Sequence, residues 1–190
     1  MATPAKGKNK RLPVTLCDNV SSLNRANDAL RSSSYIVCDC EGSNLGAEGG
    51  NLSIISLAAL PFSTNPEPYV YLIDTISLND EQLKPIYDLL RSNKYTKIMY
   101  DARMDWSELY HRHGVELTHV LDLQLADVES RKARKETPEQ QLARLPHFCS
   151  TEAISRERTS YAKVQRLNGL GPCTVEHGVV GPSENPKSSK

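Results

Sequence analysis

The order of the apolar patterns along this chain constrains its fold more than any other feature. Apolar runs of strand length come first, joined by short turns rich in Gly, Asn, Pro and Ser. These runs lie at residues 35–42, 52–60 and 69–74. Three consecutive strands with short connections predict an antiparallel meander.

Strands and helices alternate after the meander. Helical spacing is present at residues 20–32, before the meander, and at residues 81–92, after it. Strand-like and helical runs then follow one another at residues 97–100, 102–113, 120–123 and 124–134. A meander followed by βαβ units predicts an α/β fold, with a mixed β-sheet flanked by helices.

The composition is that of a globular protein. The chain has 190 residues, of which 38% are hydrophobic and 24% charged, which suits one domain with a sizeable core. The formal net charge is zero, so a polyanionic partner has to be held by a local basic patch or by metal ions. The first residues contain no apolar signal-peptide region, and no run approaches the ~18 apolar residues of a membrane span. We therefore expect a cytoplasmic or nuclear protein without a membrane partner.

The cysteines indicate reduced thiols. They number five, an odd count, and lie far apart along the chain, which argues against a disulfide framework. Cys38 and Cys40 have the spacing of half a zinc site, but no second Cys or His pair completes it. Burial in the core is the favoured interpretation.

Acidic residues follow two of the predicted strands. Residues two apart on a strand lie on the same face about 6.5 to 7 Å from each other, so Asp39 and Glu41 point together. In the later helix Asp105 and Leu109 share a face at i, i+4, so Leu109 can anchor in the core. Asp101 has the position of an N-cap that accepts amide hydrogens. We predict that Asp39, Glu41 and Asp105 are metal ligands. Asp101 is predicted to be a structural residue, or one that contacts the ligands without binding the metal itself.

Two segments resemble motifs of the DEDD 3′-5′ exonucleases, which have a ribonuclease H-like fold. The first is Ile36-Val37-Cys38-Asp39-Cys40-Glu41-Gly42, with Leu45-Gly46, Gly50 and Leu52 to Ala58 behind it. The second is Tyr100-Asp101-Ala102-Arg103-Met104-Asp105, followed by Gly114-Val115 and Asp122-Leu123-Gln124-Leu125-Ala126. The chain is most similar to the RNase D-like, Egalitarian-type branch, and the likeness covers residues 12 to 128.

This resemblance implies a two-metal mechanism. Carboxylate oxygens suit Mg²⁺ or Mn²⁺, and two such ions can stabilise both the attacking water and the leaving 3′ oxygen. Asp39 would bridge the ions, Glu41 would bind the ion that activates water, and Asp105 would hold the other ion. The implied partners are single-stranded 3′ ends of RNA or DNA, and the implied products are nucleoside 5′-monophosphates.

The family's fourth acid is missing. A third motif supplies it as Tyr-x-x-x-Asp or His-x-x-x-x-Asp, but this chain has no Asp after Asp127. Only His147 to Glu152 has the spacing, and the additional methylene of Glu displaces a ligand that needs placement within about 0.5 Å. Two hypotheses follow: a 3′-5′ exonuclease with reduced activity, or a catalytically impaired member that binds RNA or protein.

The resemblance also divides the chain into three parts. Residues 1–11 are predicted to be a flexible basic tail, and residues 12–145 the ribonuclease H-like exonuclease domain. Residues 146–190 are predicted to be an incomplete C-terminal extension of that domain, ending in a disordered tail. Leu167 to Cys173 resembles the stretch that precedes the third motif in relatives, so the sequence is consistent with a truncated, spliced or degenerate exonuclease.

Aromatic and basic residues leave further alternatives open. Trp106 and Tyr110 at i, i+4 could stack on a terminal base, but core packing is favoured. Two groups of basic residues could follow a phosphate backbone or lie on solvated faces. These groups are Arg131, Lys132, Arg134 and Lys135, and Arg156, Arg158, Lys163 and Arg166.

Overall fold

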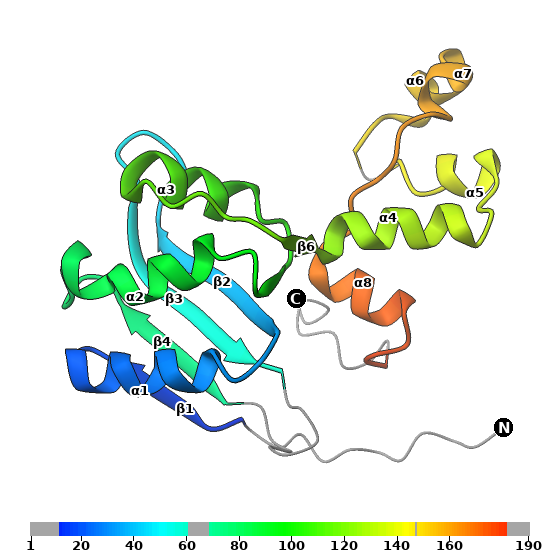
Figure 1. Cartoon of the computed structure of the whole chain (residues 1–190). Helices are drawn as coiled ribbons and strands as arrows, with labels where there is room; N and C mark the ends of the chain where they lie inside the picture. The colour runs from blue at the N-terminus through cyan, green and yellow to red at the C-terminus, as the bar shows by residue number, and fades with distance from the viewer. Residues whose placement is uncertain (1–11, 61–68, 147, 182–190) are drawn as a thin grey trace, which may run out of the picture. The chain divides into compact units, whose positions relative to one another are not determined.

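The computed structural model describes residues 12–60, 69–146 and 148–181 (Figure 1). The chain forms two compact units, Met1–Leu121 and Asp122–Lys190. Residues 1–11, predicted to be a tail, lie outside the described residues, and so do residues 182–190 of the part predicted to end in a disordered tail. The predicted domain bounds stay a prediction. Among the helices of the described ranges, none combines the length and apolarity needed to cross a membrane.

A six-stranded mixed sheet supports the first unit. Its strands are β1 (Val14–Cys17), β2 (Tyr35–Ser43), β3 (Asn51–Ala59), β4 (Val70–Asp74), β5 (Thr96–Met99) and β6 (Val120–Asp122). They lie in the order β1-β4-β3-β2-β5-β6. The pairs β2–β3 and β3–β4 are antiparallel, whereas β1–β4 and β2–β5 are parallel. The predicted α/β mixed sheet, with its meander and βαβ units, is confirmed.

Strand β1 was not predicted from the sequence. It has four residues, of which only Cys17 is buried, so its apolar alternation is too short to give a clear signal. It forms by pairing in parallel with β4, where Val14 lies opposite Val70. Such a strand depends on a partner far away in the chain, which local patterns do not reveal.

Three helices complete the first unit: α1 (Val20–Leu30), α2 (Asp80–Arg91) and α3 (Arg103–His113). Helices α1 and α2 each begin with a capping box, at Asn19 and Asn79. Both helices lie on one face of the sheet (Figure 1), and α1 contacts α2, β1 and β3. The predicted helical faces bury the expected residues, including Leu23, Leu30 and Ile86.

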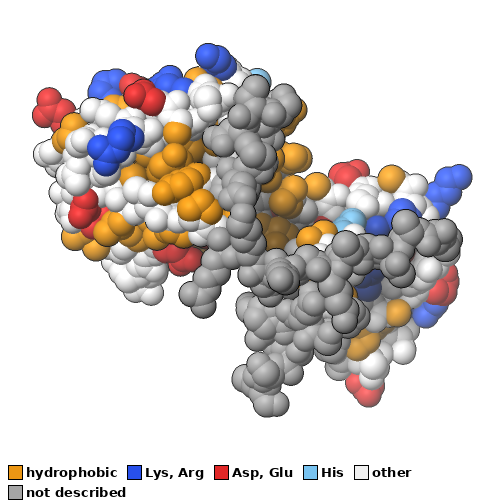
Figure 2. All heavy atoms as spheres, turned by 90° about the horizontal axis from the view of Figure 1, so that it is seen from below, with side chains coloured by type: hydrophobic (Ala, Val, Ile, Leu, Met, Phe, Trp, Pro, Cys, Tyr) orange, Lys and Arg blue, Asp and Glu red, His pale blue; other side chains and the backbone are white. Residues whose placement is uncertain are grey.

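The two faces of β2 differ. Ile36, Cys38 and Cys40 are buried with the helices in one core cluster, which confirms the predicted burial of the two cysteines. The alternate residues from Tyr35 to Glu41 are exposed on the opposite face. Other large side chains of the sheet are exposed too, and Figure 2 shows a patch of hydrophobic side chains on one face of the molecule. Strand β2 therefore carries its acids on the face away from the core.

The second unit contains short helices. They are α4 (Leu123–Ala133), α5 (Pro138–Leu142), α6 (Thr151–Arg156), α7 (Arg158–Tyr161) and α8 (Leu170–Glu176). Leu142, Leu145 and Ile154 form a small apolar cluster. Arg144 binds Glu136 at 2.6 Å and Glu176 at 2.8 Å. Ion pairs thus supplement a small core in this unit.

Candidate active site

Asp39 and Glu41 lie on the exposed face of β2, as the strand alternation predicts. A register shift between Glu41 and Gly42 marks a bulge directly after the second acid. Burial, followed by the negative charge of Glu41, raises the pKa of Asp39. No basic side chain of the described residues forms an ion pair with either carboxylate. This pair of acids is therefore uncompensated.

Asp105 projects from the first turn of α3 and is only 6% exposed. Strand β5 pairs with β2 only as far as Val37, so no strand of the described residues covers that edge of β2 further along. There the backbone of Cys40 donates a hydrogen bond to the carboxylate of Asp105. Leu109, one turn later, is fully buried and anchors the helix as predicted. The end of β5 thus makes room for Asp105 beside β2.

The charges of the three acids interact. Burial, followed by the charge of Asp39, raises the pKa of Asp105 to about 6, and Glu41 contributes in the same direction. The hydrogen bond from Cys40 opposes this shift without cancelling it. The structure therefore places Asp105 close enough to Asp39 and Glu41 for their charges to act on it. All three acids were predicted to belong to one site.

The predicted N-cap role of Asp101 is wrong. The N-cap of α3 is Ala102, and this position makes no side-chain cap hydrogen bond. Asp101 has φ of 56°, and Arg103 pairs with its carboxylate and lowers its pKa. Asp tolerates this left-handed conformation better than most residues, and a short turn there delays the helix by one residue. Asp101 is a structural residue beside the site.

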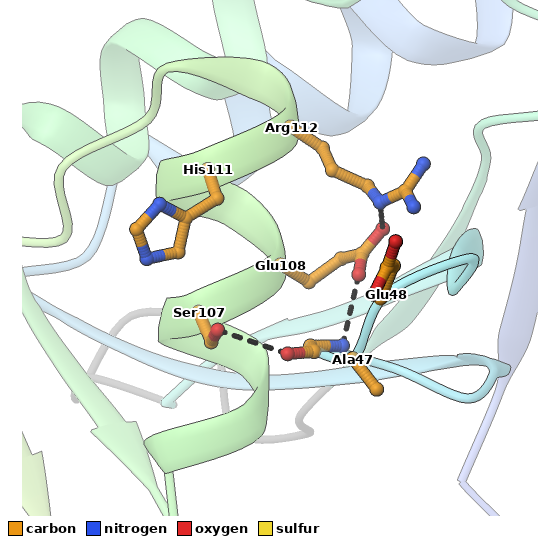
Figure 3. A pocket seen from close by; sticks show the side chains of 7 residues that line it. Ala47, Glu48, Ser107, Glu108, His111 and Arg112 are labelled. Carbon is orange, nitrogen blue, oxygen red and sulfur yellow. Dashed lines mark hydrogen bonds and ion pairs between the residues drawn. The ribbon is translucent and has the colours of Figure 1, made fainter.

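The loop after β2 is fastened to α3 at Gly46 (Figure 3). The Gly46 amide donates to Glu108 Oε2 at 2.8 Å, and Ser107 Oγ donates to the Gly46 carbonyl at 3.1 Å. Gly46 has φ of 70°, and a Cβ there would lie 2.7 Å from the Met104 carbonyl oxygen. Only glycine fits, because both the conformation and the space exclude a side chain. The loop that follows β2 and the helix that carries Asp105 are therefore held together.

A pocket of about 340 Å³ lies where this loop meets α3 (Figure 3). Its lining residues are Gly46, Ala47, Glu48, Ser107, Glu108, His111 and Arg112. Glu108 is buried, and its Oε1 lies 3.5 Å from Arg112 Nε. None of the three predicted ligands lines the pocket, so it reflects how the loop is fastened. Glu108 was not predicted as a residue near the site, although its spacing of three residues from Asp105 places both on one face of the helix.

The chemistry of the donor set fits divalent metal ions. All three donors are carboxylates, the ligands that Mg²⁺ and Mn²⁺ prefer, and a cation would relieve their mutual repulsion. Their oxygen atoms do not form a compact group: among the described residues, only Asp127, Cys173 and His177 place three donor atoms within 4.8 Å of one another. The wider spacing suits ligands distributed over two ions about 3.5 to 4 Å apart.

Glu152, the surrogate fourth acid, lies in the first turn of α6 in the second unit. It is exposed, and hydrogen bonds with the helix amide and with Ser150 lower its pKa. The other half of the motif, His147, lies outside the described residues. Glu152 therefore interacts locally at the N-terminus of α6.

The basic residues are mostly paired with acids or carbonyl groups. Arg131 is fully buried and forms an ion pair with Asp127 at 3.2 Å, so it is no phosphate ligand. Arg134 pairs with Glu176, and Arg158 with Glu139. The phosphate-binding interpretation thus fails for Arg131. The i, i+4 spacing from Asp127 to Arg131 in the sequence could have indicated this ion pair.

The predicted core packing of Trp106 and Tyr110 is wrong. Their exposed fractions are 39% and 44%, and their rings stack at 4.8 Å with an interplanar angle of 9°. His111 lies edge-on to both rings. The helix carrying Asp105 thus presents an exposed aromatic surface, because α3 buries only its Asp105, Glu108 and Leu109 face.

Comparison with known proteins identifies relatives. The sequence model of a family described as 3′-5′ exonuclease matches residues 14–159. Ribonuclease D of Bartonella henselae is 33% identical over 113 residues, which are 60% of this chain and 26% of that protein. This chain therefore spans about a quarter of that relative.

Solved structures show the same fold. RNase D of Trypanosoma brucei in complex with RNA U12 has a TM-score of 0.55 and 19% identity, covering 93% of this chain and 65% of that chain. Escherichia coli RNase D, an exoribonuclease involved in structured RNA processing, has a TM-score of 0.54 and 19% identity, covering 88% and 45%. These neighbours confirm the ribonuclease H-like fold. Because the family model matches more than half of the sequence, this chain belongs to the DEDD 3′-5′ exonuclease family.

Proposed function

We propose that this protein is a metal-dependent nuclease that shortens single-stranded nucleic acid from the 3′ end and releases nucleoside 5′-monophosphates. The carrying observation is the set of carboxylates at Asp39, Glu41 and Asp105, whose charges interact and which form no ion pair with a basic side chain of the described residues. A protein does not retain uncompensated, partly buried acids for stability, since their repulsion raises the free energy of the folded state. A divalent metal removes that penalty.

Each acid has a separate role in this proposal. Asp39 would contact two Mg²⁺ or Mn²⁺ ions, Glu41 the ion nearest the attacking water, and Asp105 the other ion. When bound, the ions stabilise the charge on the attacking and leaving oxygens of an in-line displacement. Strand β2 holds Asp39 and Glu41 at a fixed spacing, and the contact of Gly46 with Met104 keeps α3 in register with that strand.

RNA is the favoured substrate class. The stacked rings of Trp106 and Tyr110 offer an exposed face close in sequence to Asp105, and aromatic stacking binds unpaired bases without regard to sequence. The relatives support RNA over DNA, because the bacterial one is a ribonuclease and the trypanosomal one is in complex with RNA.

A second candidate function is nucleic-acid or protein binding without hydrolysis. It rests on the missing fourth acid, since no Asp follows Asp127 in the sequence. Three ligands would hold metal more weakly than four and would position the attacking water less well. The two candidates differ in whether a bound 3′ end is cleaved.

The decisive experiment uses 5′-labelled single-stranded RNA and DNA of one sequence, with Mg²⁺ or Mn²⁺. We expect a ladder of 3′-shortened RNA that requires metal, is lost in Asp39→Ala and stops at a 3′-phosphate block. Chromatography should identify nucleoside 5′-monophosphates.

Asp101→Asn is the matched control, because Asp101 is a neighbouring acid already paired with Arg103. Asn also tolerates the positive φ of this position. This variant should keep most of the activity. Folded wild-type protein that leaves RNA as intact as Asp39→Ala does, yet binds it in a fluorescence anisotropy assay, would favour the binding function instead.

A further inference from the structure

We propose that the second unit contains a zinc site formed by Asp127 of α4 and by Cys173 and His177 of α8 and its C-cap. The donor atoms of these three residues all lie within 4.8 Å of one another, although Asp127 and His177 are 50 residues apart in sequence. The site is separate from the acids of β2 and α3, and it does not depend on the function proposed for them.

The helix brings two of the donors together. Cys173 and His177 are four residues apart, and the His177 amide donates to the Cys173 carbonyl at 3.0 Å, so both side chains lie on one face. Cys and His are both common zinc ligands. Asp127 comes from the middle of α4, and a metal ion would thus join two helices.

The distances suit a tetrahedral ion. Donors bound to zinc at their usual bond lengths lie about 3.3 to 3.6 Å from one another. His177 Nε2 now lies 2.9 Å from Asp127 Oδ1. A small outward shift of the imidazole would therefore accommodate the ion between these two atoms and the Cys173 sulfur.

The surroundings of Asp127 leave one oxygen available. Asn168 Nδ2 donates to Oδ2 at 3.0 Å, and Arg131 Nη2 lies 3.2 Å from the same oxygen. Oδ1 faces only His177 among these partners. Such support of the distal oxygen fixes the orientation of ligating carboxylates in metal sites. Asn168 also donates to Glu176 Oε2 at 3.1 Å, which fixes the amide itself.

Burial and charge also favour a divalent ion. The side chain of Asp127 is 0% exposed and Cys173 is buried, whereas the side chain of His177 is 31% exposed. Metal has access from the His177 side, where a water or another ligand could take the fourth position. Arg131 balances the charge of Asp127, and zinc would balance a Cys173 thiolate. A thiolate and an imidazole select zinc over Mg²⁺.

The test measures metal binding by the full chain. We expect one equivalent of Zn²⁺ to bind in competition with a chromophoric chelator, and Co²⁺ to give a thiolate-to-metal charge-transfer band. Cys173→Ser should abolish that band. Cys173→Ser and His177→Gln should each weaken zinc binding at least about 10-fold, and Asn168→Ala should weaken it about 10-fold by releasing Asp127.

Cys149→Ser is the matched control, because Cys149 is a free and partly exposed thiol of the same unit. It should leave both the band and the affinity unchanged, and so should Asp105→Asn. A Co²⁺ spectrum of the wild type without a thiolate band would overturn the proposal. This measurement needs no variant, so it holds even if a substituted protein fails to fold. Equal loss in Cys149→Ser, or zinc binding that disappears in Asp105→Asn alone, would also overturn it.

Discussion

The acids of the two units lie in opposite surroundings. In the first unit, burial and a neighbouring acid raise the pKa of Asp39 and of Asp105, and no basic residue of the described chain pairs with Asp39. In the second unit, Asp127 is buried more deeply but has Arg131, Asn168 and His177 as partners. Neighbouring protein groups therefore balance the charge of Asp127 before any metal binds, and its Oδ1 can still serve as a ligand. The charges of the first unit have no such balance among the described residues.

The donor types differ in the same way. Asp39, Glu41 and Asp105 offer oxygen alone, and their donor atoms do not all lie within 4.8 Å of one another, which suits two hard ions. Asp127, Cys173 and His177 offer oxygen, sulfur and nitrogen within 4.8 Å, which suits one softer ion. The two units are therefore expected to select different metals from the same solution.

Removing the buried acid of the second unit should have the largest effect on stability. Asp127→Asn leaves the guanidinium of Arg131 buried without a carboxylate, and breaking such a pair costs about 3 to 5 kcal/mol. We expect the free energy of unfolding in chelator to fall by this amount, measured by urea denaturation. A loss below about 1 kcal/mol would mean that the pair adds little to stability.

The same substitution in the first unit should have the opposite effect. Asp105→Asn keeps the acceptor for the Cys40 amide but removes a repelled charge, so the free energy of unfolding in chelator should rise by about 1 to 2 kcal/mol. Metal-dependent nuclease activity should fall at least about 100-fold, because the metals supply several kcal/mol of transition-state stabilisation. Loss of both stability and activity would show that Asp105 is a structural acid.

Metal ions should stabilise the units selectively. At about 100 times its dissociation constant, an ion that binds only the folded state adds about 2.7 kcal/mol. Mn²⁺ should raise the melting temperature of wild type and Cys173→Ser but not of Asp105→Asn. One equivalent of Zn²⁺ should stabilise wild type and Asp105→Asn but not Cys173→Ser. Identical responses of the two variants would mean that the chain has a single metal site.

The contact between Gly46 and α3 can be tested with two glycines of the same loop. Gly46 and Gly49 have φ of 70° and 76°, but only at Gly46 would a Cβ meet another atom, 2.7 Å away. Both alanine variants should lose about 1 kcal/mol from backbone strain, and Gly46→Ala a further 1 kcal/mol or so from the contact. Activity should fall more in Gly46→Ala, because Asp105 moves with α3. Equal kcat values in the two variants would argue against this coupling.

Local patterns predicted much of the first unit. The meander, helices α1 to α4 and the exposed pair at Asp39 and Glu41 follow from periodicities within single segments. What the patterns missed depends on contacts between distant segments or on unusual backbone. Strand β1 needs β4, and the positive φ of Asp101 moves the N-cap to Ala102.

Local sequence patterns also did not predict which polar side chains of the second unit are buried. Arg131 resembles a surface residue in a basic run, yet Asp127 and the carbonyl of Arg166 enclose its guanidinium. Asn168 reaches Asp127 from 41 residues away. In the same way, Trp106 and Tyr110 were expected in a core because aromatic residues usually pack inside, and only the tertiary structure shows that α3 turns them outward.

Lys97 gives the most specific test of compensation. It is fully buried in the first unit, where its Nζ donates to the carbonyls of Ser92 and Tyr95 at 2.8 and 2.9 Å, and no carboxylate of the described residues pairs with it. Burial lowers the pKa of Lys97 to about 8. Between pH 8 and the unfolded value near 10.5, the unfolded chain binds more protons, so the free energy of unfolding contributed by Lys97 should rise with pH.

We expect a rise of about 1 to 2 kcal/mol across this interval relative to Lys97→Met, which lacks the titrating amine. Urea denaturation of both proteins at pH 7.5 and pH 10 measures this rise. Subtracting the values for Lys97→Met removes the pH effects of the other side chains, which both proteins share. Parallel pH profiles would mean that the two carbonyl groups stabilise the ammonium as well as water does. In that case backbone dipoles alone would compensate the buried charge of Lys97, whereas the single amide of Cys40 does not cancel the upward shift in the pKa of Asp105.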